Sequence, residues 1–311
     1  MVSLGITLGD PCGVGPEILI KSLVYLSKLK AKFFVFGDKN YLEDLSKKFF
    51  VEIPKNVEII SLSQLKINPG FPTRETHLAS IKYLKEAILW AKAGKISGLI
   101  TLPLNKEAFE VAGLPYRGHT EMLAKEFSAK SYAMSFYGKR LKVSLVTTHL
   151  PLNKVSENLK LEKIIEVARL SYWFMKRLFP KKKIKMALCG LNPHAGEGGL
   201  LGEEEEKILK PALEMAKEEG IPIDGPYPAD SLFYWALKGK FDLVIALYHD
   251  QGLIPFKMVH FRDGVNVTLG LPIIRTSPVH GTAYDIAGKG LADIGSFLSS
   301  VTLTFNLSKK C

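Results

Sequence analysis

Three histidines stand where chemistry could take place, each at the end of an apolar stretch of sequence. The stretches are "KVSLVTTH", ending at His149, "IKMALCGLNPH", ending at His194, and "FDLVIALYHD", which contains His249. Neutral imidazoles bind divalent metals, and a three-histidine set leaves coordination positions open for water or substrate, as catalytic sites require. The alternative for each histidine alone is a hydrogen-bonded loop residue. The shared construction favours a common metal site.

Several polar loops carry groups that suit an anionic ligand. "RGHTEM" places His119 and Thr120 at a helix start, where backbone N–H groups and side chains can hold an anion, although an ordinary N-cap has the same pattern. "HDQGLIPFK" joins His249 to Asp250 and Lys257. The segment "GVNVTLGLPIIRTSPVHGTAYDIAGKG" adds Asn266, Arg275, His280 and Asp285. Arginine and lysine converging on one pocket favour a phosphate or carboxylate ligand.

The elements that must position these residues alternate between strands and helices. "KFFVFG", "VEIISL", "SGLITLP", "VSLVTTH", "IKMALCGLN" and "FDLVIALYHD" have strand character, and amphipathic segments lie between them, including residues 75–95, 157–179 and "EEEEKILKPALEMAKEEG". This alternation predicts an α/β fold with a parallel sheet covered on its faces. Ligands bind at the carboxyl ends of such strands, which is where the three histidines stand.

Length and composition limit the class of protein. A chain of 311 residues, 47% hydrophobic and 23% charged, predicts a globular protein of roughly two domains, although composition reveals no boundary between them. No apolar run suits a membrane span, and the first residues lack the pattern of a secretory signal. The odd, scattered cysteines, Cys12, Cys189 and Cys311, imply neither a disulfide framework nor a thiolate zinc site. We therefore expect a cytoplasmic protein.

The formal charge of +11 raises the question of nucleic acid or membrane binding. Most lysines are spread over predicted helix surfaces, and the one dense run, "PKKKIK", leads directly into an apolar strand. A solvated lysine face explains this distribution, so we expect no nucleic-acid partner. The loop "GDPCGVGPEI" opens a helix with Pro16 in its first turn, but it is not the G-x-G-x-x-G of a Rossmann dinucleotide site.

Taken together, these motifs resemble the 4-hydroxythreonine-4-phosphate dehydrogenase family. The segments "GDPCGVGPE", "TLPLNK", "GHTE", "LNPHAGEGG", "YPADSLF", "YHDQGLIPFK" and "GLPIIRTSPVHGTAYDIAGKG" match in order from Gly9 to about Asp293. Two departures are small: Cys12 stands where the family commonly has alanine, and "TLPLNK" replaces "TAPVNK". Neither substitution touches an expected ligand.

The resemblance implies two α/β/α domains with an intervening cleft, related to isocitrate and isopropylmalate dehydrogenases. It places both termini in one domain, residues 1–125 with 262–311, and the middle domain at 126–261. A homodimer is implied, with a metal site shared between subunits in which His249 reaches an ion held by His149 and His194 of the partner.

The same resemblance implies roles for individual residues. The metal ligands would be His149, His194 and His249. Substrate would be bound by His119, Thr120, Lys257, Asn266 and Arg275. Asp230 and Asp250 would be polar neighbours of the metal, and Asp250 would either take the substrate's hydroxyl proton or orient a histidine. The adenosine part of NAD would lie on "HGTAYDIAGKG", with His280, Asp285, Gly288 and Gly290.

The implied reaction is the oxidation of 4-phosphohydroxy-L-threonine at C3 by NAD, followed by decarboxylation to 3-amino-2-oxopropyl phosphate, in pyridoxal phosphate biosynthesis. A related dehydrogenase of threonate or erythronate 4-phosphate is the nearer alternative, and a non-enzymatic anion or nucleic-acid binder is the distant one. Nitrogen ligands favour zinc or cobalt, while a site completed by water and substrate oxygens also accepts magnesium or manganese. The sequence leaves the choice between NAD and NADP open.

Overall fold

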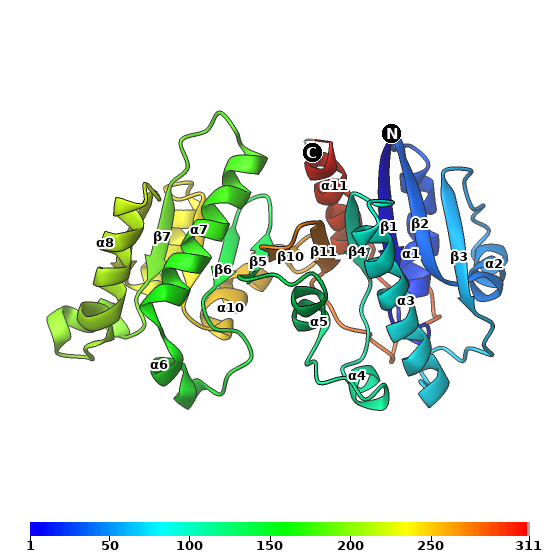
Figure 1. Ribbon diagram of the computed structural model, residues 1–311, viewed down its shortest axis with the longest axis horizontal. Coiled ribbons are helices and arrows are strands. Elements are labelled where there is room, and N and C mark those ends of the chain that lie inside the picture. Colours follow the sequence, from blue (N-terminus) through cyan, green and yellow to red (C-terminus); the bar gives the residue numbers. More distant parts are fainter. Residues whose placement is uncertain (310–311) are drawn as a thin grey trace. The chain divides into compact units, whose positions relative to one another are not determined.

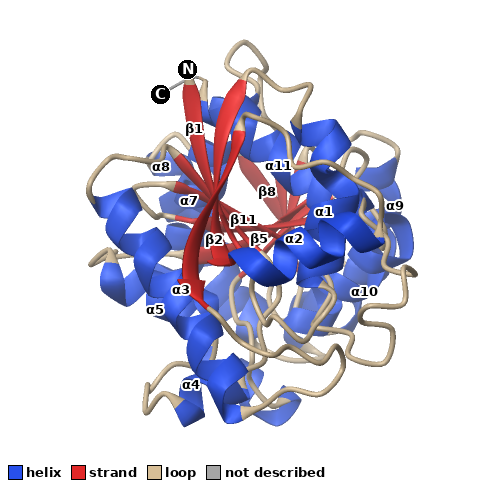
Figure 2. Ribbon diagram, turned by 90° about the vertical axis from the view of Figure 1, so that its right-hand side faces the viewer, coloured by secondary structure: helices blue, strands red, loops and turns tan. Residues whose placement is uncertain are grey.

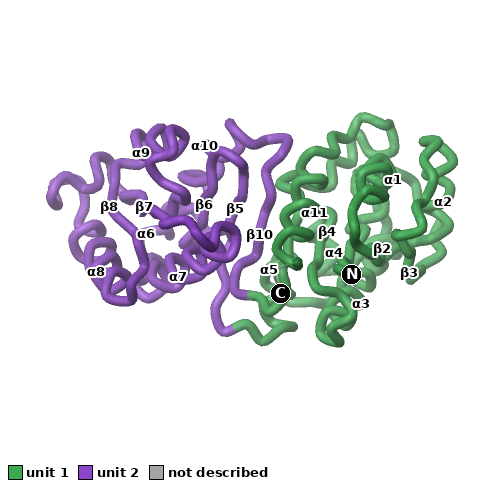
Figure 3. Tube along the Cα trace, turned by 90° about the horizontal axis from the view of Figure 1, so that it is seen from above, with its two compact units in different colours: residues 1–129, 271–311 green, residues 130–270 purple. Residues whose placement is uncertain are grey.

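In the computed structural model, which describes residues 1–309, the chain forms two compact units (Figure 3). Unit 1 comprises Met1–Ala129 and Leu271–Cys311, and unit 2 comprises Lys130–Gly270. The first strand, β1 (Val2–Thr7), and the last helix, α11 (Gly295–Ser308), both belong to unit 1. Cys12 and Cys189 are buried free thiols, whereas Cys311 lies outside the described residues.

Unit 1 contains a parallel array of strands in the order β3, β2, β1, β4, β11. The bounds of the other four are Val57–Ser63 for β3, Ala31–Asp38 for β2, Gly98–Thr101 for β4 and Ile274–Pro278 for β11. These strands include the predicted "KFFVFG", "VEIISL" and "SGLITLP" segments. Every residue of β4 is buried, as expected for a strand covered on both faces.

Helices cover both faces of the unit 1 strands (Figures 1 and 2). Helix α3 (Arg74–Lys92) packs against β1 to β4, while α1 (Gly15–Leu26) and α11 lie on the opposite side. The remaining helices are α2 (Lys39–Lys48), α4 (Glu107–Val111) and α5 (His119–Glu126). Large fully buried side chains between the layers include Leu4, Ile6, Ile18, Phe33, Phe36 and Tyr83.

Local signals start these helices where the sequence indicates. Pro16 lies in the first turn of α1, and α5 begins at His119, both as predicted. Thr73 and Thr76 form a reciprocal capping box that begins α3. Asp38 ends β2 and caps α2 by accepting a hydrogen bond from the Tyr41 N–H.

Unit 2 contains strands in the order β10, β5, β6, β9, β7, β8. Their bounds are Val265–Leu269, Ala133–Tyr137, Lys142–Leu145, Leu243–Ala246, Met186–Cys189 and Ile223–Tyr227, respectively. The four strands from β6 to β8 are parallel to one another. The expectation of a wholly parallel sheet is wrong at β5, which runs antiparallel to both β6 and β10. A tight turn, closed by the Gly138 N–H on the Leu141 carbonyl, replaces the helical crossover there.

The unit 2 helices also lie on two sides of their strands, with α7 (Leu161–Leu178) in front of β6 and α10 (His249–His260) behind it in Figure 1. Short elements are η1 (Leu152–Lys154), α6 (Val155–Asn158), η2 (Pro193–Gly199) and α9 (Ala229–Leu237). The acidic segment predicted as one helix instead begins with a π-helical turn, η3 (Glu205–Leu209), before α8 (Lys210–Glu218). Within residues 1–309, none of the helices combines the length and the hydrophobicity that a bilayer crossing requires.

Asp38 supplies a test of this local architecture. Its fully buried carboxylate accepts hydrogen bonds from Tyr41 N–H, Ser63 Oγ and Leu65 N–H at 2.9–3.1 Å. Asp38→Ala should therefore lower the free energy of unfolding by about 2–4 kcal/mol, because buried donors lose their acceptor. Denaturant titration followed by fluorescence measures this loss. Asp44→Ala, an exposed site on the same helix, should cost less than about 0.5 kcal/mol; equal losses would show that Asp38 contributes only through helix propensity.

Candidate active site

The three predicted metal histidines follow three neighbouring parallel strands. In unit 2 the order β6, β9, β7 places the strand before His249 between the strands that precede His149 and His194. Parallel strands bring their carboxyl ends to one edge of the sheet, which is the edge where α/β proteins bind ligands. The expected topological equivalence of the three positions is therefore present in the structure.

His149 and His249 lie close together within one chain. Their ring centroids are 5.8 Å apart, with an angle of 40° between the ring planes. Two imidazoles on one tetrahedral ion have centroids about 5 Å apart, given metal–nitrogen distances of about 2.0–2.1 Å. Nδ1 of His249 lies 2.6 Å from Oδ1 of Asp250, an arrangement that places the proton on Nδ1 and leaves Nε2 able to bind a metal.

His194 lies in a loop of unusual backbone conformation. His194, Ala195, Gly196, Glu197 and Gly198 all have positive φ angles, between 44° and 77°. The three that are not glycine each bear a conformational cost of about 1–2 kcal/mol. His194 is exposed, and no group of three His, Cys, Asp or Glu side chains in residues 1–309 is arranged to hold a metal. One chain thus brings two of the three predicted ligands together.

A buried acid that the sequence did not single out supports this loop. Glu205 is 1% exposed and accepts hydrogen bonds from the backbone N–H groups of Leu191 and Asn192. Gly196 must be glycine, because its φ is +77° and a Cβ would stand 2.7 Å from the Glu205 carboxylate. Within "GEEEEK" the four acids look equivalent, so the sequence does not distinguish the buried one.

Gln251 connects two of the strand ends. Its Oε1 accepts from the Leu247 N–H after β9, and its Nε2 donates to the Gly190 carbonyl after β7, both at 2.7 Å. The side chain therefore fixes the start of α10, which carries His249, relative to the segment that leads to His194. The only local signal for this role is the position of Gln251 as the third residue of a helix, where capping side chains turn back.

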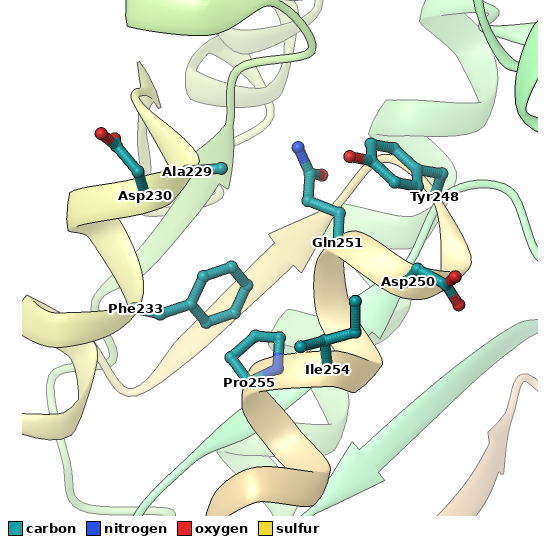
Figure 4. Close-up of a pocket in the computed structure, with 8 residues that line it drawn as sticks. All are labelled: Ala229, Asp230, Phe233, Tyr248, Asp250, Gln251, Ile254 and Pro255. Atoms are coloured by element: carbon teal, nitrogen blue, oxygen red, sulfur yellow. The ribbon is translucent and has the colours of Figure 1, made fainter.

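A hollow of about 350 Å³ opens beside His249, between α9 and α10 (Figure 4). It is lined by Ala229, Asp230, Phe233, Tyr248, Asp250, Gln251, Ile254 and Pro255. The carboxylates of Asp230 and Asp250 point away from each other in this view. Asp250 contacts His249, whereas Asp230 accepts a hydrogen bond from the Ser231 N–H within its own helix. In a single chain, only one of these two predicted metal neighbours contacts a predicted ligand.

Unit 1 contains a buried cationic group next to a neutral histidine. Arg275, on β11, is 2% exposed and donates from Nε and Nη2 to Thr101 Oγ1. Burial lowers the pKa of Arg275 to about 10, with Glu121 opposing the shift. Burial, and then the charge of Arg275, hold the pKa of His119 well below its usual value. Nε2 of His119 has no hydrogen-bond partner within residues 1–309, so this site has unused capacity for an anionic ligand.

The other predicted substrate residues are distributed over both units. Thr120, buried at 6% exposure, follows His119 in α5 of unit 1. Lys257 lies on α10 and Asn266 on β10, both in unit 2 and both partly buried. Oδ1 of Asn266 is buried without a hydrogen-bond partner in the part of the chain that the structure describes. An unpaired buried carbonyl oxygen of this kind suits a donor on a ligand.

The loop predicted to hold the adenosine of NAD is fixed by two buried acids of the "GDPCGVGPE" segment. Asp10 accepts from Tyr284 Oη at 2.6 Å. Glu17 accepts from the N–H groups of Gly290 and Ala292 at 3.0 and 2.8 Å. Gly288 and Gly290 have φ angles of +72° and +78°, Asp285 is exposed, and His280 is partly exposed. Both segments are recognisable as motifs in the sequence, but the hydrogen bonds between them are not.

The fold and the family of this chain follow from comparison with known proteins. The chain superposes on isocitrate dehydrogenase from Methylococcus capsulatus with a TM-score of 0.53 at 13% identity, covering 99% of this chain and 88% of that one. A likeness at this identity shows the fold alone, so the predicted similarity in fold to isocitrate dehydrogenase is confirmed. The chain belongs to the family described as pyridoxal phosphate biosynthetic protein PdxA, whose model matches residues 23–304.

The relatives agree with the resemblance read from the motifs. A 4-hydroxythreonine-4-phosphate dehydrogenase from Sulfurihydrogenibium is 43% identical over 99% of both chains. The crystal structure of an enzyme of the same name from Klebsiella pneumoniae superposes with a TM-score of 0.86 at 34% identity, covering 99% of this chain and 100% of that one. A D-threonate 4-phosphate dehydrogenase from Pectobacterium atrosepticum is 38% identical over 98% of this chain and 99% of that one. The predicted family is confirmed.

His119 should remain neutral well below neutral pH, since burial and Arg275 both disfavour its protonated form. NMR of protein with labelled histidine should show one imidazole whose signals do not change between pH 7.5 and 6, and His119→Gln should remove that signal. Because the unfolded chain takes up this proton at about pH 6.5, His119 should also reduce stability progressively as pH falls below that value. A His119 signal that titrates near pH 6.5 would contradict the assignment.

Proposed function

We propose that this protein oxidises 4-phosphohydroxy-L-threonine at C3 with NAD and releases carbon dioxide to form 3-amino-2-oxopropyl phosphate. The observation that carries the proposal is the buried Arg275 beside a neutral His119, within a chain that is similar along its whole length to dehydrogenases of this name. A phosphorylated substrate supplies an anion that the Arg275 guanidinium and the His119 imidazole can bind.

His119, Thr120 and Arg275 would bind the phosphorylated end of the substrate, and Lys257 and Asn266 would contact its remaining polar groups. The planar guanidinium is well suited to a phosphate because its donors form a fork that matches two oxygens. Arg275 is already held by Thr101, so little side-chain freedom is lost on binding. This rigidity would orient the C3 hydrogen toward the nicotinamide.

His149, His194 and His249 are the side chains that would hold a divalent metal. Zinc or cobalt suits the nitrogen ligands best, and magnesium or manganese suits a site completed by oxygens. The ion would supply positive charge next to the substrate oxygen on which negative charge develops in both oxidation and decarboxylation. The 5.8 Å separation of the His149 and His249 rings and the Asp250 contact fit this role. Asp250 would keep the His249 proton on Nδ1.

NAD would bind on the loop from His280 to Gly290. Asp10 and Glu17 hold this loop from beneath, while His280 and the exposed Asp285 remain accessible to a cofactor. The positive φ angles of Gly288 and Gly290 turn the backbone sharply, a conformation that brings N–H groups toward a ligand.

A homodimer would complete the metal site. Helices α9 and α10 and the residue that follows α10 carry exposed apolar side chains: Tyr234, Trp235, Ile254, Met258 and Phe261. Apolar side chains on adjacent helices mark a surface that a second copy can cover. Two arrangements share the ligands between chains. The resemblance predicts His149 and His194 from one chain with His249 from its partner, whereas the ring contact in one chain favours His149 with His249.

The relative from Pectobacterium atrosepticum supports a second candidate, the oxidation of D-threonate 4-phosphate. The two substrates differ in their substituent at C2, an amine in one and a hydroxyl in the other. NADH formation should be measured with both at equal concentration. We expect kcat/KM to be at least about tenfold higher with the amine, because a site that pairs a charged group rejects an analogue without it. A preference for D-threonate 4-phosphate would replace the first proposal with the second.

Mixed dimers test the shared metal site. Histidine-to-alanine variants are unfolded in pairs and refolded so that about half of the dimers are mixed, and one intact site of two restores about a quarter of wild-type activity. His194→Ala with His249→Ala should recover under either shared arrangement. His149→Ala with His249→Ala recovers only if His249 comes from the partner, and His149→Ala with His194→Ala only if His194 does. No recovery in any pair, with mixed dimers verified by mass spectrometry, would place all ligands on one chain.

A further inference from the structure

One acid in the run Glu203–Glu206 differs from its neighbours in its surroundings. Glu203 and Glu206 are exposed and pair with Lys207 and Lys210, one turn along. Glu205 is 1% exposed and points into unit 2. It begins the π-helical turn η3, which spaces the acids differently from an α-helix at the point where one of them turns inward.

Both oxygens of the Glu205 carboxylate accept hydrogen bonds from the segment before His194. Oε1 accepts from the N–H groups of Leu191 and Asn192, each at 2.8 Å, and Oε2 accepts from the Asn192 side-chain amide at 2.9 Å. Glu204 accepts from the same amide at 2.8 Å. Two backbone amides and one side chain, all within three residues of His194, therefore have this pair of acids as their hydrogen-bond acceptors.

The loop closes around the same carboxylate. A Cβ on Gly190 would lie 3.3 Å from Oε1, and one on Gly196 would lie 2.7 Å from Oε2, so both glycines lie against the acid. Gly196 is itself the middle residue of the left-handed run from His194 to Gly198. Such a run persists only where its surroundings fix it, because each residue alone prefers another conformation.

The opposite side of this segment is fixed independently. The Gly190 N–H donates to the Tyr227 carbonyl at 2.8 Å, and the Gly190 carbonyl accepts from Gln251 at 2.7 Å. These two hydrogen bonds hold the chain in place at Gly190, after the end of β7. Glu205 controls the direction that the chain takes beyond it.

We propose that Glu205 is a positioning residue that sets the orientation of His194 by holding the Leu191 and Asn192 amides. The proposal rests on the proposed function, in which His194 is a metal ligand. Glu205 does not contact the reacting groups, so it acts through the conformation of the loop. A ligand held in position before the ion arrives binds it more tightly than one that must be ordered on binding.

Cobalt titration tests the proposal, with visible absorption reporting coordination by histidine. Glu205→Gln keeps the shape of the side chain but loses the charge and places an amide donor opposite Asn192. We expect its dissociation constant for Co²⁺ to rise about tenfold, the lower end of the range for residues that orient metal ligands. Glu206→Gln, the exposed neighbour, should match wild type. The KM for NAD should stay within about twofold in both variants, because the NAD loop lies in unit 1.

Hydrogen exchange of the peptide spanning residues 190–200, measured without metal, provides the second readout. The amides should exchange about tenfold faster in Glu205→Gln than in Glu206→Gln or wild type. If Glu205→Gln does not fold, Asn192→Ala removes one contact to the acid and should still weaken Co²⁺ binding about threefold.

The outcomes separate this proposal from the proposed function. Unchanged Co²⁺ affinity and unchanged exchange in Glu205→Gln, while His194→Ala abolishes binding, overturn the role of Glu205 and leave the metal site intact. A wild-type protein whose Co²⁺ binding does not depend on His194 overturns the metal function, and the role of Glu205 in that function with it.

Discussion

Buried carboxylates that hold loop amides are the interaction on which the proposed site depends. A loop has no regular ladder for its N–H groups, so those that are buried need an acceptor from elsewhere. Asp10, Glu17, Asp38 and Glu205 are at most 1% exposed, and each accepts from at least one backbone N–H of a loop. An ionised carboxylate suits this task because it accepts several hydrogen bonds, each stronger than a neutral one. The parallel strands bring the loops to one edge, and these acids then fix their shapes.

The electrostatic arrangement of unit 1 follows from the burial of Arg275. Burial of His119, and then the charge of the neighbouring guanidinium, lower the pKa of His119, so it stays neutral and can donate or accept a hydrogen bond. Two hydrogen bonds to Thr101 hold the Arg275 guanidinium in place. A phosphorylated ligand would add charge-assisted hydrogen bonds to this guanidinium. The formal charge of +11 therefore need not indicate a general affinity for polyanions. A buried cation interacts with an anionic ligand more strongly than exposed lysines do, because solvent and salt screen the exposed charges.

In unit 2, conformational strain is concentrated near the proposed metal ligands. Five consecutive left-handed residues in η2 and the π-helical turn of η3 are both irregular, and they contact each other through Glu205. A regular helix at either place would satisfy the backbone hydrogen bonds at a lower conformational cost. It would also change the path of the chain after β7 and therefore the position of His194. Irregular backbone of this kind is commonly retained where a functional geometry requires it. Gln251 connects the start of α10 to Gly190, from which the chain continues toward η2.

The sequence by itself determined the features that depend on near neighbours: the strands that lead to His149, His194 and His249, the helix starts at Pro16 and His119, and the motifs of the family. Tertiary structure decided which of four similar acids is buried, since Glu205 differs from Glu203 and Glu206 only in what packs around it. It also decided the contact of Glu17 with Gly290, which lies 273 residues away along the chain, and the antiparallel direction of β5. Local patterns specify secondary structure through short-range sterics and periodicity. Burial and long-range hydrogen bonds arise only when distant segments meet, so they are not readable from a single stretch of sequence.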